Sequence, residues 1–549
     1  MHKNKILFFT TILIAALASN YLHYQIKTQK LELPNLETSF AERLFNRYVA
    51  VTLEADLSSL TINQAQMLPI LAQACRQMDQ LYLQQNWGDL HALGSEIRDP
   101  VKQKLLRLNY GPWEKTNGNY SFIPGLDQKP KGWNFYPKGL APKVFDYITL
   151  DGKQSSYSYL KRNAEGKFFV EYYSQVHFSE LQKTQELLEK ASELAEHQGF
   201  KNYLKAVGAS LRQDDFYQSD LAWVKLKDNP IDLIIGPIET YDDDLLGLKA
   251  SFEGLLLLRD ESWTTRLQGF SSLLPDLQNS LPLPKSIPLP SPKWDAGLGV
   301  YQVLLHCGQA NAGIKAIAIN LPNDPRIQQE HGSRTLQLKN VMEAKFKLMM
   351  KPLSQVLIHP SQLDLVTFNA FFENTLFHEV AHGLGVKKNQ NGKTLSKTFG
   401  DSNMELEEAK ADILSLYFLN SLKNSGKIES QIMEQYVTFV AGMIRTMRFG
   451  PSSAHGRAAL VRWNFLHQRQ AFIITDQGLM IHKEKMAKAV SELTTKILQI
   501  QATGTFEDYQ TLREEHKSLG PSIRFLLAKV KEAKIPVDIY FEQGPKYWH

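Results

Sequence analysis

Two histidines four positions apart, His378 and His382, lie in a segment whose apolar residues recur at helical spacing. Because an α-helix completes a turn in about 3.6 residues, both imidazoles point the same way and can bind one metal ion. Glu379 lies about 100° further round the helix, where its carboxylate can reach a metal-bound water without replacing it. Gly383 and Gly385 then end the predicted helix. The pattern therefore predicts a semi-buried helix with a metal-binding face.

A second predicted helix, residues 405–420, places Glu408 and Asp412 on one face, with Glu407 beside them. One of the two carboxylates can bind the metal while the other accepts a hydrogen bond from the free ring nitrogen of a histidine ligand. Taken alone, each helix is also compatible with a solvated polar face. Together they predict a zinc site with three protein ligands and an open fourth position, which is typical of a catalytic zinc ion in a hydrolase.

The length and charge of the chain limit the number of lobes and the kinds of partner that we expect. The 549 residues are enough for two or more lobes with a large core. The formal net charge of +5 is small for this length and no extended basic stripe is present, so a nucleic-acid partner is not indicated. The hydrophobic content of 43% is ordinary for a globular chain and does not separate an enzyme from a binding protein.

The N-terminus resembles an export signal. A basic start, residues 1–5, precedes an apolar run at 6–17 and a small-residue cleavage site at 16–18. The run is short for a membrane span, so we expect a cleaved signal peptide, residues 1–18, rather than an uncleaved anchor. The mature protein is then exported, periplasmic or secreted, and it meets a membrane only if the segment stays uncleaved.

The two cysteines of the chain, Cys75 and Cys307, allow two interpretations. In an exported protein they could form a disulfide, and two buried thiols are equally compatible with the sequence. Neither cysteine lies in a cluster with ligand spacing, so neither is assigned to the metal site.

The spacing of apolar residues along the chain predicts both helices and strands. Helical spacing covers 34–110, 178–211 and most of 340–530, and short alternating or apolar runs predict strands at 157–160, 168–173, 232–238, 254–258, 300–305 and 316–321. The segment 273–293 is rich in proline, so we expect it to be non-helical and to cross between lobes.

Four further segments resemble the dipeptidyl peptidase III family of zinc exopeptidases. Residues 406–412 read Leu-Glu-Glu-Ala-Lys-Ala-Asp, and residues 238–242, Ile-Glu-Thr-Tyr-Asp, are similar to the family's Glu-Ser/Thr-Tyr-x-Asp segment. Residues 320–324, Asn-Leu-Pro-Asn-Asp, resemble its Asn-x-Pro-Asn segment, and residues 454–458, Ala-His-Gly-Arg-Ala, resemble its distal histidine segment. The motifs occur in the family's order over roughly 235–470.

The resemblance implies a site for the substrate's amino terminus. Glu239, Asn320 and Asn323 would bind the α-ammonium group and the first peptide units, and a carboxylate with two amides suits a cationic amine beside backbone groups. From the residues alone, the two asparagines are better explained by turn chemistry around Pro322. Arg457 would also contact substrate, although an arginine at that position can instead form a structural ion pair.

The resemblance also implies the reacting groups. His378, His382 and Glu408 would hold one Zn²⁺, with Asp412 and Glu407 next to the ligands. Glu379 would act as general base, and the two remaining groups of the predicted site, Tyr241 and His455, would stabilise negative charge on the scissile carbonyl.

This chain departs from the family's best-known members in its zinc motif. It has two residues between Glu379 and His382 where those members have three, and it is shorter. It is therefore similar to a shorter branch with a five-residue motif, some of whose members are fused to Nudix domains, although no Nudix box is visible here. Whether dipeptides or single residues leave the substrate stays open.

We therefore predict an α+β fold with two lobes separated by a cleft. Residues 19–340 form a mixed α/β lobe, and residues 341–549 form a mainly helical lobe that carries zinc, with C-terminal helices returning to the first lobe. The predicted function is a zinc exopeptidase that releases dipeptides from the N-termini of short peptides. The alternatives are an exported peptide-binding protein with an inactive or structural metal site, and an aminopeptidase that releases single residues. The sequence makes no prediction of oligomeric state.

Overall fold

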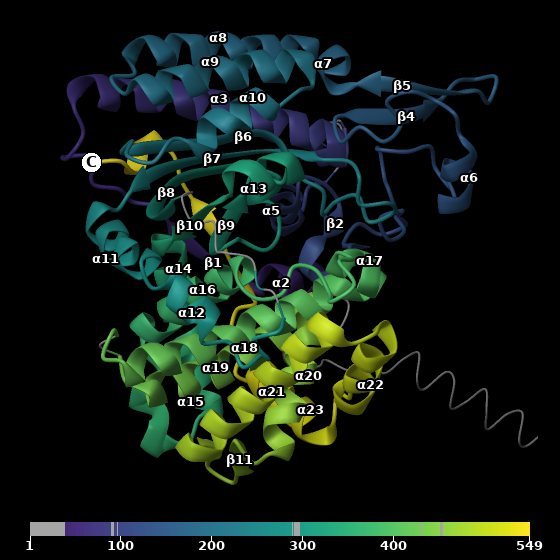
Figure 1. Cartoon of the computed structure of the whole chain (residues 1–549). Helices are drawn as coiled ribbons and strands as arrows, with labels where there is room; N and C mark the ends of the chain where they lie inside the picture. Colours follow the sequence, from purple (N-terminus) through teal and green to yellow (C-terminus); the bar gives the residue numbers. More distant parts are fainter. Residues whose placement is uncertain are drawn as a thin grey trace, which may run out of the picture. The chain divides into compact units, whose positions relative to one another are not determined.

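The computed structural model describes residues 39–88, 93–95, 97–287, 289, 297–428, 430–448, 450 and 454–549 (Figure 1). The chain divides into two compact units, Met1–Arg43 and Leu44–His549, and the fold described here is that of the second. The predicted signal peptide lies outside the described residues, as do residues 288 and 290–293 of the proline-rich stretch. Among the helices that are described, none is both long enough and apolar enough to cross a bilayer.

A mixed sheet of five strands, in the order β6-β7-β8-β10-β9, forms the centre of the α/β lobe. Its neighbours pair antiparallel except β10 and β8, which run parallel. The long strands are buried almost throughout, which explains their nearly continuous apolar sequences. The strands predicted in this region are confirmed, with the bounds β6 (Ile231–Glu239), β7 (Ser251–Arg259), β8 (Leu298–Gly308) and β9 (Ala318–Leu321). A further strand, β10 (Arg334–Leu338), was not predicted.

Helices gather against this sheet, and Figure 1 shows α8 and α9 outermost, with α3 and α10 between them and the strands. The long helix α3 begins with a reciprocal capping box between Thr61 and Gln64, which satisfies N–H groups that have no partner within the helix. Its buried face contacts β7 and β8 and contributes to the first hydrophobic core. The helices of this lobe are α3 (Ile62–Asn86), α5 (Pro100–Asn109), α6 (Pro142–Tyr147), α7 (Tyr173–Val176), α8 (Phe178–Leu194), α9 (Gln198–Gln213), α10 (Tyr217–Val224) and α13 (Pro325–His331).

Two short hairpins accompany the sheet. The first joins β2 (Trp113–Glu114) to β3 (Tyr120–Ser121), and the second joins β4 (Ser158–Arg162) to β5 (Phe168–Tyr172). The second hairpin confirms the strands predicted at 157–160 and 168–173. The 34–110 segment is less uniformly helical than expected, because β1 (Tyr48–Thr52) interrupts it.

A second hydrophobic core is built mainly from helices. A long helical run, α14 (Lys339–Lys345), a π-helical turn (Phe346–Met350) and α15 (Lys351–Leu357), leads into it. Helices α16 and α18 pack side by side at its centre. The mainly helical prediction for 340–530 is confirmed by α16 (Phe368–Gly383), α17 (Leu395–Phe399), α18 (Asn403–Asn424), α19 (Ile432–Met447), α20 (Ala454–Gln468), α21 (Lys483–Thr503), α22 (Phe506–His516) and α23 (Pro521–Glu532), with a hairpin of β11 (Phe472–Thr475) and β12 (Gly478–Ile481).

The segment 273–293 was predicted to be non-helical, and this prediction is wrong for its first part. It begins with α12 (Leu274–Asn279), where Pro275 occupies the first turn and its missing N–H costs no hydrogen bond. Together with α11 (Glu261–Ser271), this helix contributes buried side chains to the helical core, although it precedes residue 340. The residues that follow include Pro284, and several later prolines lie outside the described residues.

The two cores confirm the α+β fold with a mixed lobe and a mainly helical lobe. The element that returns to the first lobe is a strand, β13 (Asp538–Glu542), which pairs parallel with β1. The apolar faces of α21 to α23 are instead buried in the helical core, so these helices do not return. A buried ion pair between Lys345 and Asp538, 2.8 Å apart, ties the returning strand to α14.

Candidate metal centre

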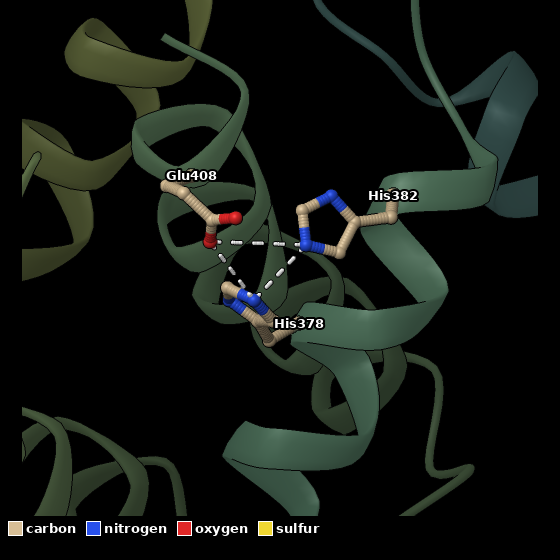
Figure 2. A group of neighbouring side chains, drawn as sticks. All are labelled: His378, His382 and Glu408. Atoms are coloured by element: carbon tan, nitrogen blue, oxygen red, sulfur yellow. Dashed lines mark hydrogen bonds and ion pairs between the residues drawn. The ribbon is translucent and has the colours of Figure 1, made fainter. Parts of the chain in front are cut away.

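Three side chains from α16 and α18 converge on one point (Figure 2). The Nε2 atoms of His378 and His382 lie 3.1 Å apart. Oε2 of Glu408 lies 3.4 Å from Nε2 of His378 and 3.8 Å from Nε2 of His382. The four-residue spacing predicted this pairing on α16, and the tight packing of α18 against α16 supplies the carboxylate.

A carboxylate lies against the outer ring nitrogen of each histidine. Oδ1 of Asp412 is 2.5 Å from Nδ1 of His378, and Oε1 of Glu407 is 3.2 Å from Nδ1 of His382. Ionised carboxylates accept hydrogen bonds, so both histidines carry their proton on Nδ1 and present an Nε2 lone pair inward. The sequence predicted such a contact for Asp412 and placed Glu407 beside the ligands.

These donors fit a divalent cation. Two inward lone pairs 3.1 Å apart repel each other unless a positive charge lies between them. Oε2 of Glu408 is buried, and ring nitrogens of His378, His382 and His455 surround it at 3.4, 3.8 and 3.0 Å, so this carboxylate oxygen is placed to share a cation with them. Burial alone would lower the pKa of His378, but Asp412 and Glu408 raise it well above its usual value, so the centre favours positive charge. Two imidazoles and one carboxylate are typical ligands of catalytic zinc.

Cations behind the outer carboxylates keep them ionised. Arg462, which is 1% exposed, pairs with Oδ2 of Asp412. The Nζ of Lys410 lies 2.6 Å from Oε1 of Glu407. Burial would raise the pKa of both carboxyl groups, but Arg462 holds the pKa of Asp412, and Lys410 that of Glu407, well below the usual range.

Neither Lys410 nor Arg462 was predicted from the sequence, although each had a local signal. Lys410 lies three positions after Glu407 on one helix, a spacing at which opposite charges meet. Arg462 lies two helical turns after His455 on α20, so it shares that residue's face. Neither spacing is specific enough by itself to predict a role at a metal site.

Glu379 and Tyr241 are two further reacting groups expected near these ligands. Glu379 is half-buried on α16 between the two histidines. Enclosure of the Tyr241 phenol by the walls around it raises its pKa although the side chain is 77% exposed, and the charges of Glu239, Glu408 and Glu379 raise it further. Tyr241, from the α/β lobe, therefore lies within electrostatic reach of the metal ligands and of the amine-binding segment.

The distal histidine segment reaches the centre from the start of α20. The Nδ1 of His455 lies 3.0 Å from Oε2 of Glu408, and its ring remains 60% exposed, so the other ring edge is open to a ligand. Two residues later, Nε of Arg457 donates to Oε2 of Glu405 at 2.8 Å. The guanidinium thus pairs with a buried carboxylate of α18, which matches the structural alternative considered for Arg457.

The segments predicted to bind the substrate's amino terminus come together in part. Nδ2 of Asn323 donates to Oε2 of Glu239 at 3.3 Å and to the carbonyl of Ile238 at 3.2 Å. Asn320 lies on β9, where its Oδ1 accepts a hydrogen bond from the Thr335 hydroxyl at 3.3 Å. Burial raises the pKa of Glu239, although the hydrogen bond from Asn323 opposes this rise.

A cavity of about 770 Å³ adjoins these residues. Glu239, Tyr241 and Asn323 line it from the α/β lobe, and Met404, at the start of α18, lines it from the helical lobe. The cavity thus belongs mainly to the α/β lobe, borders the helical lobe at Met404, and has room for the first residues of a peptide.

A helical lobe with two histidines and a glutamate at a candidate metal centre, facing an α/β lobe across a cleft, defines this protein as a metallopeptidase. Residues 150–387 match the model of peptidase family M49. The structure of DPP III from Caldithrix abyssi is similar with a TM-score of 0.87 and 31% identity, over 91% of this chain and 98% of that one. The chain belongs to peptidase family M49, the dipeptidyl peptidase III family.

Two further relatives are similar to this chain. Dipeptidyl-peptidase III from Corallococcus sp. strain EGB is 30% identical with a TM-score of 0.81, over 91% of this chain and 96% of that one. The Arabidopsis thaliana protein named Nudix hydrolase 3 is 29% identical over 566 aligned positions, which cover 91% of this chain and 73% of that protein. Part of the plant protein thus has no counterpart here, and its name describes that protein alone.

Proposed function

We propose that this metallopeptidase is a zinc-dependent exopeptidase that removes dipeptides from the N-termini of short peptides. The observation that carries the proposal is the arrangement of one cleft. A two-histidine, one-glutamate centre lies within electrostatic reach of Tyr241, and Tyr241 shares a cavity with the Glu239–Asn323 pair. The two similar structures, both described as dipeptidyl peptidase III, support release of dipeptides.

Zinc held by His378, His382 and Glu408 would lower the pKa of a bound water molecule to about 7 and would polarise the scissile carbonyl. The remaining ring nitrogens would stay fixed by their carboxylates, which keeps both imidazoles oriented toward the centre.

We assign the proton transfers to Glu379. Its position between the two histidines on α16, outside the group of candidate ligands, supports a role beside the centre rather than as a ligand. In the proposed reaction, Glu379 accepts a proton from the attacking water and later donates it to the leaving amine. As the carbonyl oxygen becomes negative, the Tyr241 phenol and the His455 ring donate hydrogen bonds to it. The raised pKa of Tyr241 keeps its phenol protonated and able to donate.

The substrate's amino terminus would be held by Glu239 and the two asparagines. The carboxylate of Glu239 is largely buried, and its ionised form is costly without a cation nearby. An α-ammonium group would offset that cost, with the Asn320 and Asn323 amides binding the first peptide units. A substrate with a blocked amino terminus would bring no such charge and would bind weakly.

The location of the enzyme is a separate part of the proposal. The basic start, apolar run and small-residue site at residues 1–18 support export to the periplasm or the medium. N-terminal sequencing of the mature protein should find residue 19 first, and an intact Met1 would contradict cleavage.

Replacement of Glu379 by Gln tests the reaction most simply. Metal content and hydrolysis of dipeptidyl- and aminoacyl-naphthylamides are measured for the wild type and for Glu379→Gln. We expect the wild type to hydrolyse dipeptidyl substrates, and the variant to lose turnover by at least about 10³-fold while it keeps its zinc. Retained turnover in the variant would refute the role of Glu379, and a preference for aminoacyl substrates would favour an aminopeptidase.

A further inference from the structure

Tyr241 extends from the loop after β6 with little to hold its side chain, which is 77% exposed. A side chain with so few contacts takes its position from the backbone that carries it. The next three residues of the loop are aspartates, Asp242, Asp243 and Asp244, and each carboxylate has partners elsewhere in the lobe. These contacts therefore determine where the phenol lies.

Asp243 and Asp244 fix the far side of the loop. The carboxylate of Asp243 accepts hydrogen bonds from the backbone N–H groups of Leu248 and Lys249 at 2.8 and 3.0 Å, and from the Tyr136 hydroxyl at 2.6 Å. The carboxylate of Asp244 accepts one from the N–H of Gly132 at 2.8 Å. The loop is thus closed on itself and tied to the segment after β3.

Asp242, directly after Tyr241, is bound to a different part of the chain. Its Oδ1 lies 2.5 Å from Nζ of Lys115, and its Oδ2 accepts a hydrogen bond from the Tyr82 hydroxyl at 2.6 Å. Both side chains of the ion pair are largely buried, at 12% exposure for Asp242 and 16% for Lys115. Burial would raise the pKa of Asp242, but Lys115 and Lys129 hold it well below its usual range. The pair is therefore charged and poorly screened by solvent.

Lys115 is itself held in one place. Its backbone N–H donates to Oδ1 of Asn109 at 3.1 Å, and the neighbouring Glu114 carboxylate accepts a hydrogen bond from Nδ2 of Asn109 at 3.1 Å. Its aliphatic stem runs past Gly313, where an added Cβ would lie 2.8 Å from Cβ of Lys115. The absence of a side chain at Gly313 leaves a path for the lysine toward the loop.

We propose that Lys115 and Asp242 form a positioning pair that holds the Tyr241 hydroxyl where it donates to the substrate carbonyl. The inference rests on the proposed role of Tyr241. Lys115 lies outside the family-like motifs, which occur over roughly 235–470. Asp242 occupies the variable position x of the Glu-Ser/Thr-Tyr-x-Asp segment. Neither residue needs to touch the substrate, because the pair acts through the backbone between Asp242 and Tyr241.

A double-mutant cycle separates positioning from general stability. The variants are Lys115→Met, Lys115→Arg, Tyr241→Phe and the double variant Lys115→Met/Tyr241→Phe, and kcat, KM and Tm are measured for each zinc-loaded enzyme. We expect Tyr241→Phe to lower kcat by roughly 10²-fold and Lys115→Met to lower it by about tenfold with little change in KM. Lys115→Arg should restore most of kcat. In the Tyr241→Phe background, Lys115→Met should lower kcat by less than about twofold, because the group it positions is absent.

Lys131→Met is the matched control, since Lys131 is an exposed lysine of the same region and should keep wild-type kcat. If Lys115→Met does not fold, Asp242→Asn takes its place in the cycle. Additive losses in the double variant, or unchanged kcat in Lys115→Met, would overturn the positioning pair alone. Full activity of Tyr241→Phe would overturn the pair together with the proposed role of Tyr241.

Discussion

Each histidine of the metal centre is held by a carboxylate, and each carboxylate is held by a buried or partly buried cation. This order of contacts, from Arg462 through Asp412 to His378, fixes the ring tautomer before any metal binds. The same order runs from Lys410 through Glu407 to His382. The centre is thus prepared for a cation by residues that never contact it.

Asp412→Asn tests this preparation. An asparagine would present an amide N–H₂ to Arg462 or to His378, so one of the two contacts is lost. We expect zinc affinity to fall about 10- to 100-fold, measured by competition with a chromophoric chelator. Glu484→Gln, at an exposed acid of α21, is the control and should leave the affinity unchanged. Wild-type affinity in Asp412→Asn would contradict the role assigned to this carboxylate.

A buried histidine far from the metal gives the fold a dependence on pH. His177 is 3% exposed; its Nε2 lies 2.8 Å from the Tyr159 hydroxyl and its Nδ1 lies 2.9 Å from Oε1 of Gln84, which suits the neutral ring. Burial lowers its pKa from 6.5 to about 4. The unfolded chain therefore binds the proton first as the pH falls below 6.5, and the folded state loses stability until the pH reaches about 4.

The contribution of His177 to this loss should be about 2 kcal/mol between pH 7 and pH 5. We expect the free energy of unfolding of His177→Gln to fall less than that of the wild type over this interval, measured by denaturant titration at each pH. Other titrating groups are common to both proteins, so the difference isolates the imidazole. Parallel pH profiles for the two proteins would show that His177 is not held neutral.

At the scale of elements, α18 is the helix on which the site depends. It packs against α16, α20 and α21. Its first turn carries Glu405, which is 2% exposed and pairs with Arg457 of α20 and with Arg513 of α22. These pairs hold the start of α20, and with it His455, against the metal ligand Glu408.

Arg457→Met distinguishes this structural role from substrate binding. Loss of the guanidinium leaves the buried Glu405 carboxylate with a weaker partner, so we expect a destabilisation of about 2 kcal/mol, measured by denaturant unfolding. Glu405→Gln should be similarly destabilised, and the double variant should lose much less than the sum. A rise in KM without any loss of stability would instead support direct contact between Arg457 and the substrate.

The elements that could be predicted from the sequence are those with a local signal. Helices α16 and α18 have periodic apolar faces and bring ligands to one side by spacing alone, and the strands β6 to β9 have apolar runs bounded by polar loops. Lys115 and Asp242 meet across more than a hundred positions, and β13 pairs with β1 from the other end of the chain, so no local pattern indicates either contact. The assignment of α11 and α12 to the helical core likewise depends on packing between distant segments.

At the scale of the whole molecule, the reaction needs both lobes. The candidate metal ligands and Glu379 lie on α16 and α18 of the helical lobe, whereas Glu239, Tyr241 and Asn323 belong to the α/β lobe. The two lobes are each stabilised by their own hydrophobic core, so the metal is not needed to build the fold. Metal removal should therefore affect activity far more than structure.

Treatment with a zinc chelator tests this separation. We expect the chelated enzyme to lose its peptidase activity, to keep its far-ultraviolet circular dichroism spectrum, and to show a modest decrease in Tm, because the ligands were stabilised by the ion. Addition of Zn²⁺ should restore activity. Global unfolding on chelation would show that the metal is structural, as in the peptide-binding alternative.

The most direct test of the proposed function is the mass of the first product. A heptapeptide with a free amino terminus and its N-acetylated form are each incubated with the zinc-loaded enzyme, and the fragments are identified by mass spectrometry. The account predicts that dipeptides leave the N-terminus of the free peptide and that the acetylated peptide is cut far more slowly. Release of single residues, internal cleavage, or equal turnover of the acetylated peptide would contradict it.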